Sequence, residues 1–459
     1  MIAFTRDPGL SPGSALPVLA KSDGRLRRGD PVVTDHGPPP LSGDRARAAG
    51  HGARLRIAFV GNAPPRRCGI ATFTDDLQRA VGASADVSET AIFAMRDPGG
   101  VYAWPPSVRF AIDQNDPAAY RAAADAINRG GFDVVCLQHE FGIFGGPAGD
   151  FVLGLIAALR VPLITTLHTV LDQPDAAQRS VMNAILAASF RVVVMANKGR
   201  DILIDSYGAD PDRVVIIPHG IPDARFENSD RAKRKLGLAG RKVILTFGLI
   251  GPNKGIEAMI EAMPAIVAAA PDALYVLMGA THPHLLRHAG ESYRDALMTR
   301  VHELGLEHHV LFINRFVDRP DLLEQIAACD IYVTPYPCVS QLTSGALAYS
   351  HGQGRAVVST PYWHAAELLA DGSGVLVPFG DPAALGRAVA TLLADEPLRL
   401  AMAYQAYAAS RPTVWAQTAR HYVDCFLGAC RQFRMVQSGP RDRAIVGQLP
   451  ARSPRDCYA

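Results

Sequence analysis

The sequence has no long apolar run and no cysteine framework. No stretch approaches the roughly 20 apolar residues that a membrane-spanning helix requires, and the first residues lack the apolar core of a signal peptide. The seven cysteines show no C-x-x-C spacing, so reduced thiols that pack as small hydrophobes are expected. We therefore expect a cytoplasmic protein without a transmembrane segment, and peripheral membrane contact stays open.

Charge of one sign is also lacking. The chain has 46 basic and 44 acidic side chains, for a net charge of +2 over 459 residues. A protein that binds nucleic acid through bulk electrostatics would carry a clear excess of positive charge. We therefore expect no nucleic-acid partner.

Several motifs of hydrolases, metalloenzymes and nucleotide-binding proteins are absent. The sequence contains no H-E-x-x-H metal motif, no G-x-S-x-G nucleophile elbow between a predicted strand and a helix, and no G-x-x-x-x-G-K-[ST] phosphate loop. It also lacks G-x-G-x-x-G after its first predicted strand. We expect neither a metal ion nor a bound cofactor.

Short β-branched runs alternate with helical periodicity through most of the chain. Such runs, apolar along their whole length, are typical of parallel strands that helices cover on both faces. A first series of runs spans 55–61, 132–140, 162–169, 191–197 and 213–220, and a second spans 242–250, 274–280, 309–315, 331–336, 356–360 and 374–378. The pattern predicts an α/β protein with two doubly wound, Rossmann-like domains in tandem.

The polar stretch 222–242 separates the two series and predicts the domain boundary. Residues 1–53 and 436–459 are rich in Pro, Gly, Arg and Asp without periodicity, which is typical of disorder. We predict a disordered arm over 1–53, a first Rossmann-like domain over 54–225, a second over 226–405, a helical region over 406–435 that packs back on the first domain, and a disordered tail over 436–459.

Polar residues follow several predicted strands of the first domain. Arg66 and Gly69 follow the first strand, and a glycine at a helix start lets backbone N–H groups approach an anion or a sugar. His168, and the pair His139 and Glu140, end two other strands, where ligands of parallel sheets bind. Each also has a plain structural reading: a turn for Gly69, a core residue for His168 and a helix cap for Glu140.

The second domain has two candidate phosphate-binding segments. In "FGLIGPNKGIEAMIEA", Gly248 ends a strand and Lys254 offers one cation before a helix begins. In "PYPCVSQLTSGALAYSHGQG", residues 343–345 (Thr-Ser-Gly) begin a helix directly after a strand. Free N–H groups at such a helix start favour a diphosphate.

Taken in order, these segments resemble a GT-B glycosyltransferase, and most closely glycosyltransferase family 4 (glycosyl transferases group 1). The resemblance covers roughly residues 55 to 430 and rests on "PPRRCGIATF", "TTLHT", "VVIIPHGIPD", "FGLIGPNKGIE", "CDIYVTPY", "SGALAYSHGQGRAVVSTPYW" and "GVLVPFGDPAALGRAV". It implies two Rossmann-like domains that face each other across a cleft, with an acceptor domain over 54–225 and a nucleotide-sugar donor domain over 226–405.

The resemblance also implies a function. Family members transfer a sugar from a nucleotide-sugar to a hydroxyl acceptor with retained configuration, usually without a metal. It implies that Lys254 binds the donor diphosphate and that His168 contacts the donor sugar at the reaction centre. Gly69 and Gly248 would lie near the donor, and the helix start would bind the diphosphate through Thr343, Ser344 and Gly345. Arg66, His139 and Glu140 would lie on the acceptor side.

The chain departs from the family pattern at several positions. Leu249 stands where an arginine is common, and we expect Arg315 to supply the missing cation. Gln341 and Tyr349 replace two glutamates that meet the donor sugar and the ribose. We keep both as donor-binding residues, with Tyr349 either covering the ribose or packing in the core.

These departures leave three functions open. The first is a retaining hexosyltransferase, with mannose or glucose as the leading donor sugars and a saccharide or another hydroxyl compound as acceptor. The second is a catalytically inert binding or scaffold protein of the same fold. The third is a sugar-nucleotide epimerase of the same fold.

Overall fold

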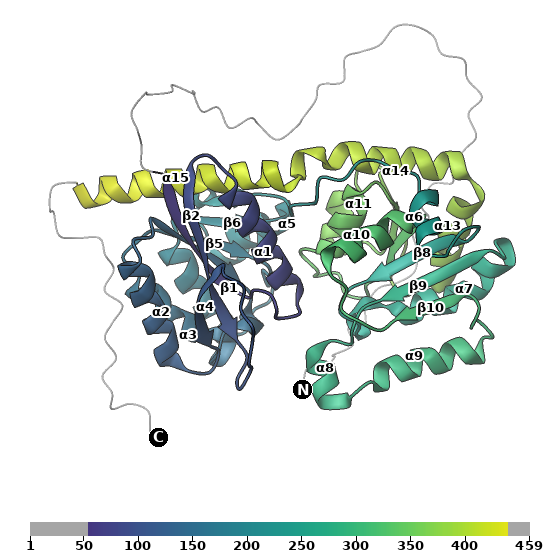
Figure 1. The fold of residues 1–459 in the computed structure, drawn as a ribbon, viewed down its shortest axis with the longest axis horizontal. Helices are drawn as coiled ribbons and strands as arrows, with labels where there is room; N and C mark the ends of the chain where they lie inside the picture. The colour runs from purple at the N-terminus through teal and green to yellow at the C-terminus, as the bar shows by residue number, and fades with distance from the viewer. Residues whose placement is uncertain (1–53, 439–459) are drawn as a thin grey trace, which may run out of the picture. The chain divides into compact units, whose positions relative to one another are not determined.

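The computed structural model describes residues 54–438. The predicted arm over 1–53 and residues 439–459 of the predicted tail lie outside the described residues, whereas residues 436–438, which were predicted as disordered, are helical. Two parallel β-sheets, each covered by helices, follow one another along the chain (Figure 1). The predicted α/β class with two Rossmann-like units is confirmed.

The first sheet has seven strands in the order β3-β2-β1-β4-β5-β6-β7. All of its neighbouring strands are parallel. The strands are β1 (Leu55–Gly61), β2 (Val87–Arg96), β3 (Val108–Asp113), β4 (Val134–His139), β5 (Leu163–Leu167), β6 (Arg191–Val194) and β7 (Val214–Ile216). The helices of this unit are α1 (Gly69–Gly82), α2 (Pro117–Arg129), α3 (Phe151–Ala158), α4 (Ala176–Ala188) and α5 (Asn197–Tyr207).

The second sheet has six strands in the order β10-β9-β8-β11-β12-β13, again parallel. The strands are β8 (Lys242–Phe247), β9 (Ala273–Met278), β10 (Val310–Ile313), β11 (Ile331–Thr334), β12 (Ala356–Ser359) and β13 (Val375–Leu376). The helices are α6 (Asp230–Lys235), α7 (Ile256–Ala269), α8 (Pro283–Ala289), α9 (Ser292–Glu303), α10 (Arg319–Ala328), α11 (Gly345–Gly352), α12 (Trp363–Leu368), α13 (Pro382–Ala394) and α14 (Glu396–Ser410).

Each sheet has a point where the strand order reverses, between β1 and β4 in the first and between β8 and β11 in the second. Loops leave the carboxyl ends of these neighbouring strands in opposite directions and open a crevice between them. The loops after β8 and β11 carry the two segments that the sequence singled out, around Lys254 and around Ser344. The topology therefore brings these segments together.

The last described helix, α15 (Trp415–Ser438), packs on the first sheet although it follows the second in sequence (Figure 1). Tyr422 and Phe426 are fully buried in one core cluster with β1, β4 and α1. The Phe426 ring meets Phe59 edge to face at 6.4 Å, and the Tyr422 hydroxyl lies 3.0 Å from that of Thr166. The end of the chain's described part therefore completes the core of its beginning.

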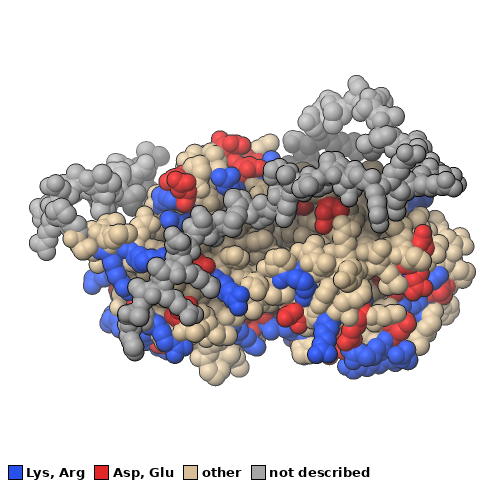
Figure 2. Space-filling view, turned by 90° about the horizontal axis from the view of Figure 1, so that it is seen from above, with Lys and Arg blue, Asp and Glu red and all other residues tan. Residues whose placement is uncertain are grey.

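Charge on the surface is mixed. Figure 2 shows one face, on which Lys and Arg side chains alternate with Asp and Glu side chains among other residues. Arg300 and Glu261, for example, form an ion pair at 2.5 Å, with about two fifths of each side chain exposed. Within residues 54–438, no helix is long and apolar enough to cross a membrane.

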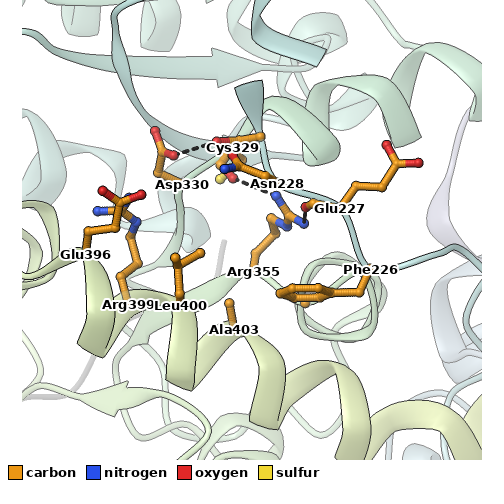
Figure 3. A pocket seen from close by; sticks show the side chains of 12 residues that line it. Phe226, Glu227, Asn228, Cys329, Asp330, Arg355, Glu396, Arg399, Leu400 and Ala403 are labelled. Atoms are coloured by element: carbon orange, nitrogen blue, oxygen red, sulfur yellow. Dashed lines mark hydrogen bonds and ion pairs between the residues drawn. The ribbon is translucent and has the colours of Figure 1, made fainter. Parts of the chain in front are cut away.

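A cavity is lined by residues 226–229 of the segment that joins the two units, by Cys329 and Asp330 just before β11, by Arg355 and by residues of α14 (Figure 3). The Arg355 guanidinium donates to four backbone carbonyls, which include that of Glu227 at 2.7 Å. The cavity has an accessible volume of about 20 Å³, which is room for about one water molecule. Arg355 therefore fixes the joining segment, and the cavity is too small for a substrate.

Because Phe426 is fully buried, Phe426→Ala should remove aromatic packing and leave a cavity. We expect the free energy of unfolding to fall by about 3–5 kcal/mol in urea denaturation. Met435 lies on the same helix with 65% of its surface exposed, so Met435→Ala should change it by about 0.5 kcal/mol or less. Equal effects of the two changes would contradict this packing of α15.

Candidate active site

A glycine allows close contact between the loops that follow β8 and β11 in the second sheet. Gly255 has a φ of +61°, and a Cβ at this position would lie 2.0 Å from the carbonyl oxygen of Pro335. Any side chain would therefore push the loop after β8 away from the loop after β11. With glycine, the start of α7 rests directly on the Pro335 backbone.

Lys254 lies beside a buried tyrosine at this junction. Its Nζ donates to the Tyr336 hydroxyl at 2.9 Å and sits 4.3 Å from the centre of the Tyr336 ring. Burial acts to raise the pKa of Tyr336, but the Lys254 charge and the hydrogen bonds from Lys254 and Ser344 outweigh it, so this pKa is lowered. The lysine is held by a polarised hydroxyl and a ring face, and no carboxylate neutralises it among the contacts described for Lys254.

Helix α11 begins next to this lysine and its tyrosine. Ser344 caps the helix, because its Oγ accepts the N–H of Leu347 at 3.2 Å. The same Oγ lies 3.5 Å from the Tyr336 hydroxyl, so the first turn of α11 stands beside Lys254. The Thr343 hydroxyl is buried without a hydrogen-bond partner in the described chain.

His364 forms a hydrogen bond with the backbone at the start of α11. Its Nδ1 accepts the backbone N–H of Ser344 at 2.9 Å, so the ring is neutral with its proton on Nε2. Burial, assisted by His219 and His351, lowers the pKa of His364 to about 3. No acceptor within 54–438 takes the N–H of Gly345 or Ala346. These free donors and the helix dipole favour an anion.

In the first unit, α1 begins at Gly69, and Cys68 caps it through a hydrogen bond from the N–H of Ala71 to Sγ. A Cβ on Gly69 would meet no atom within 4 Å. The chain itself thus leaves the space beside the first turn of α1 open.

His168 follows β5 directly and is neutral. Its Nε2 lies 3.0 Å from Oε1 of Gln138, so Nε2–H donates and Nδ1 keeps its lone pair. Burial, with the nearby His219 and His139, lowers the pKa of His168 to about 3. The ring lies perpendicular to that of Phe73 of α1, with the two ring centroids 4.9 Å apart. His168 can accept a hydrogen bond at Nδ1 but is not charged at neutral pH.

Sequence reasoning assigned no role to His219, which follows β7. Its ring meets Phe73 at 5.0 Å, and its Nδ1–H donates to the Gly220 carbonyl at 2.7 Å. A Cβ on Gly345 would lie 2.9 Å from Nε2 of His219, so this nitrogen faces the first turn of α11. Burial lowers the pKa of His219 to about 4. The signal was its place at a strand end in "VVIIPHG".

Three residues predicted on the acceptor side lie in their own clusters. His139 is fully buried, stacks on Phe144 at 5.8 Å, and neither ring nitrogen has a partner in residues 54–438. Glu140 caps the turn η1 (Phe141–Ile143) through the Phe141 N–H and also accepts the Thr169 hydroxyl. The helix-cap alternative is therefore present in the structure.

Arg66 turns toward the ends of β2 and β3. It forms an ion pair with Asp97 at 2.7 Å and donates to Asn62 at 2.8 Å. Asp97 also accepts a hydrogen bond from Tyr102. The charge of Arg66 is thus matched by a carboxylate within the first unit.

Among the predicted donor residues, Gly248 has a φ of +131° and open space where a Cβ would be. Arg315 is exposed and pairs with Asp321 of α10 at 3.0 Å, and no described contact joins it to Lys254. The Gln341 amide donates to the carbonyl of Thr343 at 2.7 Å. It therefore borders the start of α11.

Tyr349 lies one turn into α11 with only 5% of its surface exposed. Its hydroxyl donates to Asp76 of α1 and accepts the Trp415 indole N–H at 3.4 Å. The ring belongs to the core of the second unit. Core packing, one of the two positions that the sequence offered for Tyr349, is therefore present in the structure.

Within the described chain, no group of three or more His, Cys, Asp and Glu side chains is arranged to hold a metal ion. The positive charge beside the first turn of α11 comes from Lys254 and from the helix start.

Buried neutral histidines make stability depend on pH. The pKa values of His139, His168 and His364 are lowered to about 3, and those of His219 and His351 to about 4, mainly by burial. The unfolded chain takes up these protons near pH 6.5, and the folded chain does not. Stability should therefore be retained above 6.5 and fall as the pH drops below it, by up to about 1.4 kcal/mol per pH unit for each ring.

Urea denaturation between pH 7 and pH 5 measures this slope. The slope of the unfolding free energy against pH reports how many protons the chain takes up on unfolding. We expect His139→Leu to lower this number by about one, since it removes one ring that stays neutral in the folded chain. His421→Leu is the control because His421 is exposed on α15, and it should leave the slope unchanged. A slope in His139→Leu equal to that of the wild type would contradict the buried neutral state of His139.

Family models match most of the described chain. The model described as "Glycosyltransferase Family 4" matches residues 69–225, and that described as "Glycosyl transferases group 1" matches residues 228–409. The first covers the unit with α1 and His168, and the second covers the unit with Lys254 and α11.

Curated relatives carry one recurring name. The chain is 27% identical over 299 residues to a D-inositol 3-phosphate glycosyltransferase of Nocardia farcinica. The aligned region covers 61% of this chain and 64% of the relative. It is 29% identical over 307 residues to the D-inositol 3-phosphate glycosyltransferase of Corynebacterium kroppenstedtii. That alignment covers 62% of this chain and 66% of the relative. The match thus spans somewhat less than two thirds of these relatives.

Solved structures share the fold. Sucrose-phosphate synthase from Thermosynechococcus elongatus aligns with a TM-score of 0.66 at 18% identity, covering 83% of this chain and 100% of that one. HepE of Anabaena, solved in complex with UDP-glucose, aligns with a TM-score of 0.64 at 17% identity, covering 82% and 100%. The paired sheets, the two family models and these likenesses agree: the chain belongs to the GT-B glycosyltransferases, with a Glycosyltransferase Family 4 domain followed by a Glycosyl transferases group 1 domain.

Proposed function

We propose that the protein is a retaining glycosyltransferase that moves a hexosyl group from a nucleotide diphosphate sugar to a hydroxyl acceptor. One observation carries this proposal: the Lys254 ammonium and the Tyr336 and Ser344 hydroxyls gather beside the free N–H groups that begin α11. A diphosphate has the charge and the oxygen acceptors that such a set of donors would bind.

The same set of groups suits the chemistry of the transfer. When the bond between sugar and phosphate breaks, negative charge grows on the leaving diphosphate. Lys254 and the dipole of α11 would stabilise that charge without moving, because Tyr336 and Gly255 already hold them in place. The acceptor hydroxyl would attack from the face that the diphosphate leaves, and a phosphate oxygen would take its proton.

His168 would serve as a hydrogen-bond acceptor in this reaction. Its Nε2–H is given to Gln138, and its ring is neutral. It therefore supplies a lone pair at Nδ1 that a hydroxyl of the donor sugar can use, and no proton for the leaving group. His219, whose Nε2 faces Gly345, would supply a second lone pair near the diphosphate end.

The donor sugar proposed first is glucose or mannose. HepE was solved with UDP-glucose, which makes UDP-glucose one donor to test beside GDP-mannose. The curated relatives are named for D-inositol 3-phosphate, so polyol phosphates head the acceptors to test beside saccharides. We propose that no metal takes part, since Lys254 and the helix start would bear the charge.

Two other functions keep a stated test. An inert binding protein of this fold would bind its partner equally well after Lys254→Ala and His168→Ala. An epimerase would change the donor sugar in the absence of any acceptor. The neutral His168 pairs with an amide and not with a carboxylate, which gives little support to proton abstraction and favours the transferase.

Purified protein with UDP-, GDP- and ADP-sugars and a panel of saccharide and polyol phosphate acceptors tests the proposal through nucleotide release. We expect release with at least one donor that depends on an acceptor. Neither binding nor release across the whole panel would overturn the proposed function.

Lys254→Ala should lower kcat/KM by about tenfold to a hundredfold, since it removes a charged donor to the diphosphate. Lys235→Ala is the matched control because Lys235 is exposed and pairs with Glu324 on the surface. The control should keep wild-type rates. Near-wild-type rates in Lys254→Ala would remove this lysine from the diphosphate site.

Chelation of divalent metals tests the proposed charge source. Because a lysine and backbone N–H groups would neutralise the diphosphate, we expect turnover in excess EDTA to stay within about twofold of that without it. Loss of turnover in EDTA and its recovery with Mg²⁺ or Mn²⁺ would show that a metal carries this charge.

A further inference from the structure

A buried carboxylate joins the two units of the protein. Asp76 lies on α1, and the second unit reaches it with two side chains. The Tyr349 hydroxyl of α11 donates to one of its oxygens, and the guanidinium of Arg319, at the start of α10, pairs with the other. The Asp76 side chain is only 1% exposed.

Further contacts hold this group in place. Arg319 also lies 3.4 Å from Asp75, which is paired with Arg79 on the same helix. The indole N–H of Trp415 donates to the Tyr349 oxygen at 3.4 Å. Helices α10 and α11 thus meet α1 at one carboxylate, and α15 contacts the tyrosine that binds it.

The two helices that Asp76 connects carry different parts of the proposed site. Helix α11 begins at Gly345, beside Ser344 and Lys254. Helix α1 carries Phe73, whose ring meets His168 and His219. The contact between Asp76 and Tyr349 therefore sets how far the start of α11 stands from His168.

We propose that Asp76, Arg319 and Tyr349 are positioning residues, which hold the donor helix α11 at the working distance from His168 and do not bind the donor themselves. This inference rests on the proposed function. It assigns Tyr349 to the contact between the units in place of the ribose. It follows that the transfer step needs this contact, whereas binding of the nucleotide does not.

The burial of the group supports this assignment. A tyrosine with 5% exposure, whose hydroxyl already serves Asp76 and Trp415, has little left to offer a nucleoside. A buried carboxylate and a guanidinium are costly to separate, so the group resists partial opening. Transfer is sensitive to such geometry, because an error of about 1 Å in placement can cost about a hundredfold in rate.

The test uses Tyr349→Phe and Asp76→Asn in the full chain. Tyr349→Phe keeps the buried ring and removes only the hydroxyl. Asp76→Asn keeps an acceptor for Tyr349 and removes the charge that Arg319 needs. We expect kcat to fall by about tenfold to a hundredfold in both variants. The Kd for UDP or GDP, by calorimetry, should stay within about twofold of wild type.

Tyr404→Phe is the control, since Tyr404 is exposed on α14, and it should change neither quantity. An increase of about tenfold or more in the Kd of Tyr349→Phe would overturn the proposal and place the hydroxyl on the donor. Wild-type kcat in both variants would overturn it as well.

Failure of the proposed function is recognised separately. If the wild type binds no nucleotide, the contact between the units is tested by small-angle scattering. The double variant Asp76→Asn with Tyr349→Phe should then show a larger radius of gyration than wild type, with unchanged helical content by circular dichroism. An unchanged radius would overturn the positioning contact whether or not the protein is a transferase.

Discussion

The candidate site depends on a contact that only glycine permits. Gly255 lies so close to the Pro335 carbonyl that a Cβ would be 2.0 Å from its oxygen, and its φ of +61° suits glycine best. This approach joins the loop after β8 to the loop after β11. Lys254 reaches Tyr336 because of it, and Tyr336 in turn lies beside the Ser344 cap of α11. The Lys254 cation and the start of α11 therefore lie side by side.

A second constraint connects this place to the first unit. The aromatic ring of Phe73 touches both His168 and His219, and Asp76, one turn further along α1, holds Tyr349 and Arg319. Helix α15 adds Trp415 to the same junction and buries Phe426 in the first core. Stability and function therefore share residues, since α1 is at once a core helix and the support of the proposed reaction centre.

Much of the fold could be predicted from the sequence because most strands are short, continuous apolar runs. Strands β2 and β3 were not predicted. In β2 the polar residues 88–90 interrupt the buried run, which comprises Val87 and Ala91 to Met95, and the edge strand β3 has a single fully buried residue. The pattern of β3 reflects its edge position, and that of β2 reflects a strand whose first half is only partly covered.

The candidate site was predicted where its signal is local. The loop of Lys254 and the cap at Ser344 can each be recognised from neighbouring residues. Their partners Tyr336 and His364 could not, because those contacts join distant segments. The same reason explains Tyr349: its sequence position suggested the donor, but its hydroxyl partner Asp76 is 273 residues away.

The central claim is that the start of α11 and Lys254 together bind the diphosphate of a nucleotide. A crystal structure of the full chain with bound UDP or GDP tests it most directly. The account predicts diphosphate oxygens within hydrogen-bond distance of Lys254 Nζ and of the N–H of Gly345. A nucleotide whose diphosphate lies elsewhere, with Lys254 still on Tyr336 alone, would contradict it.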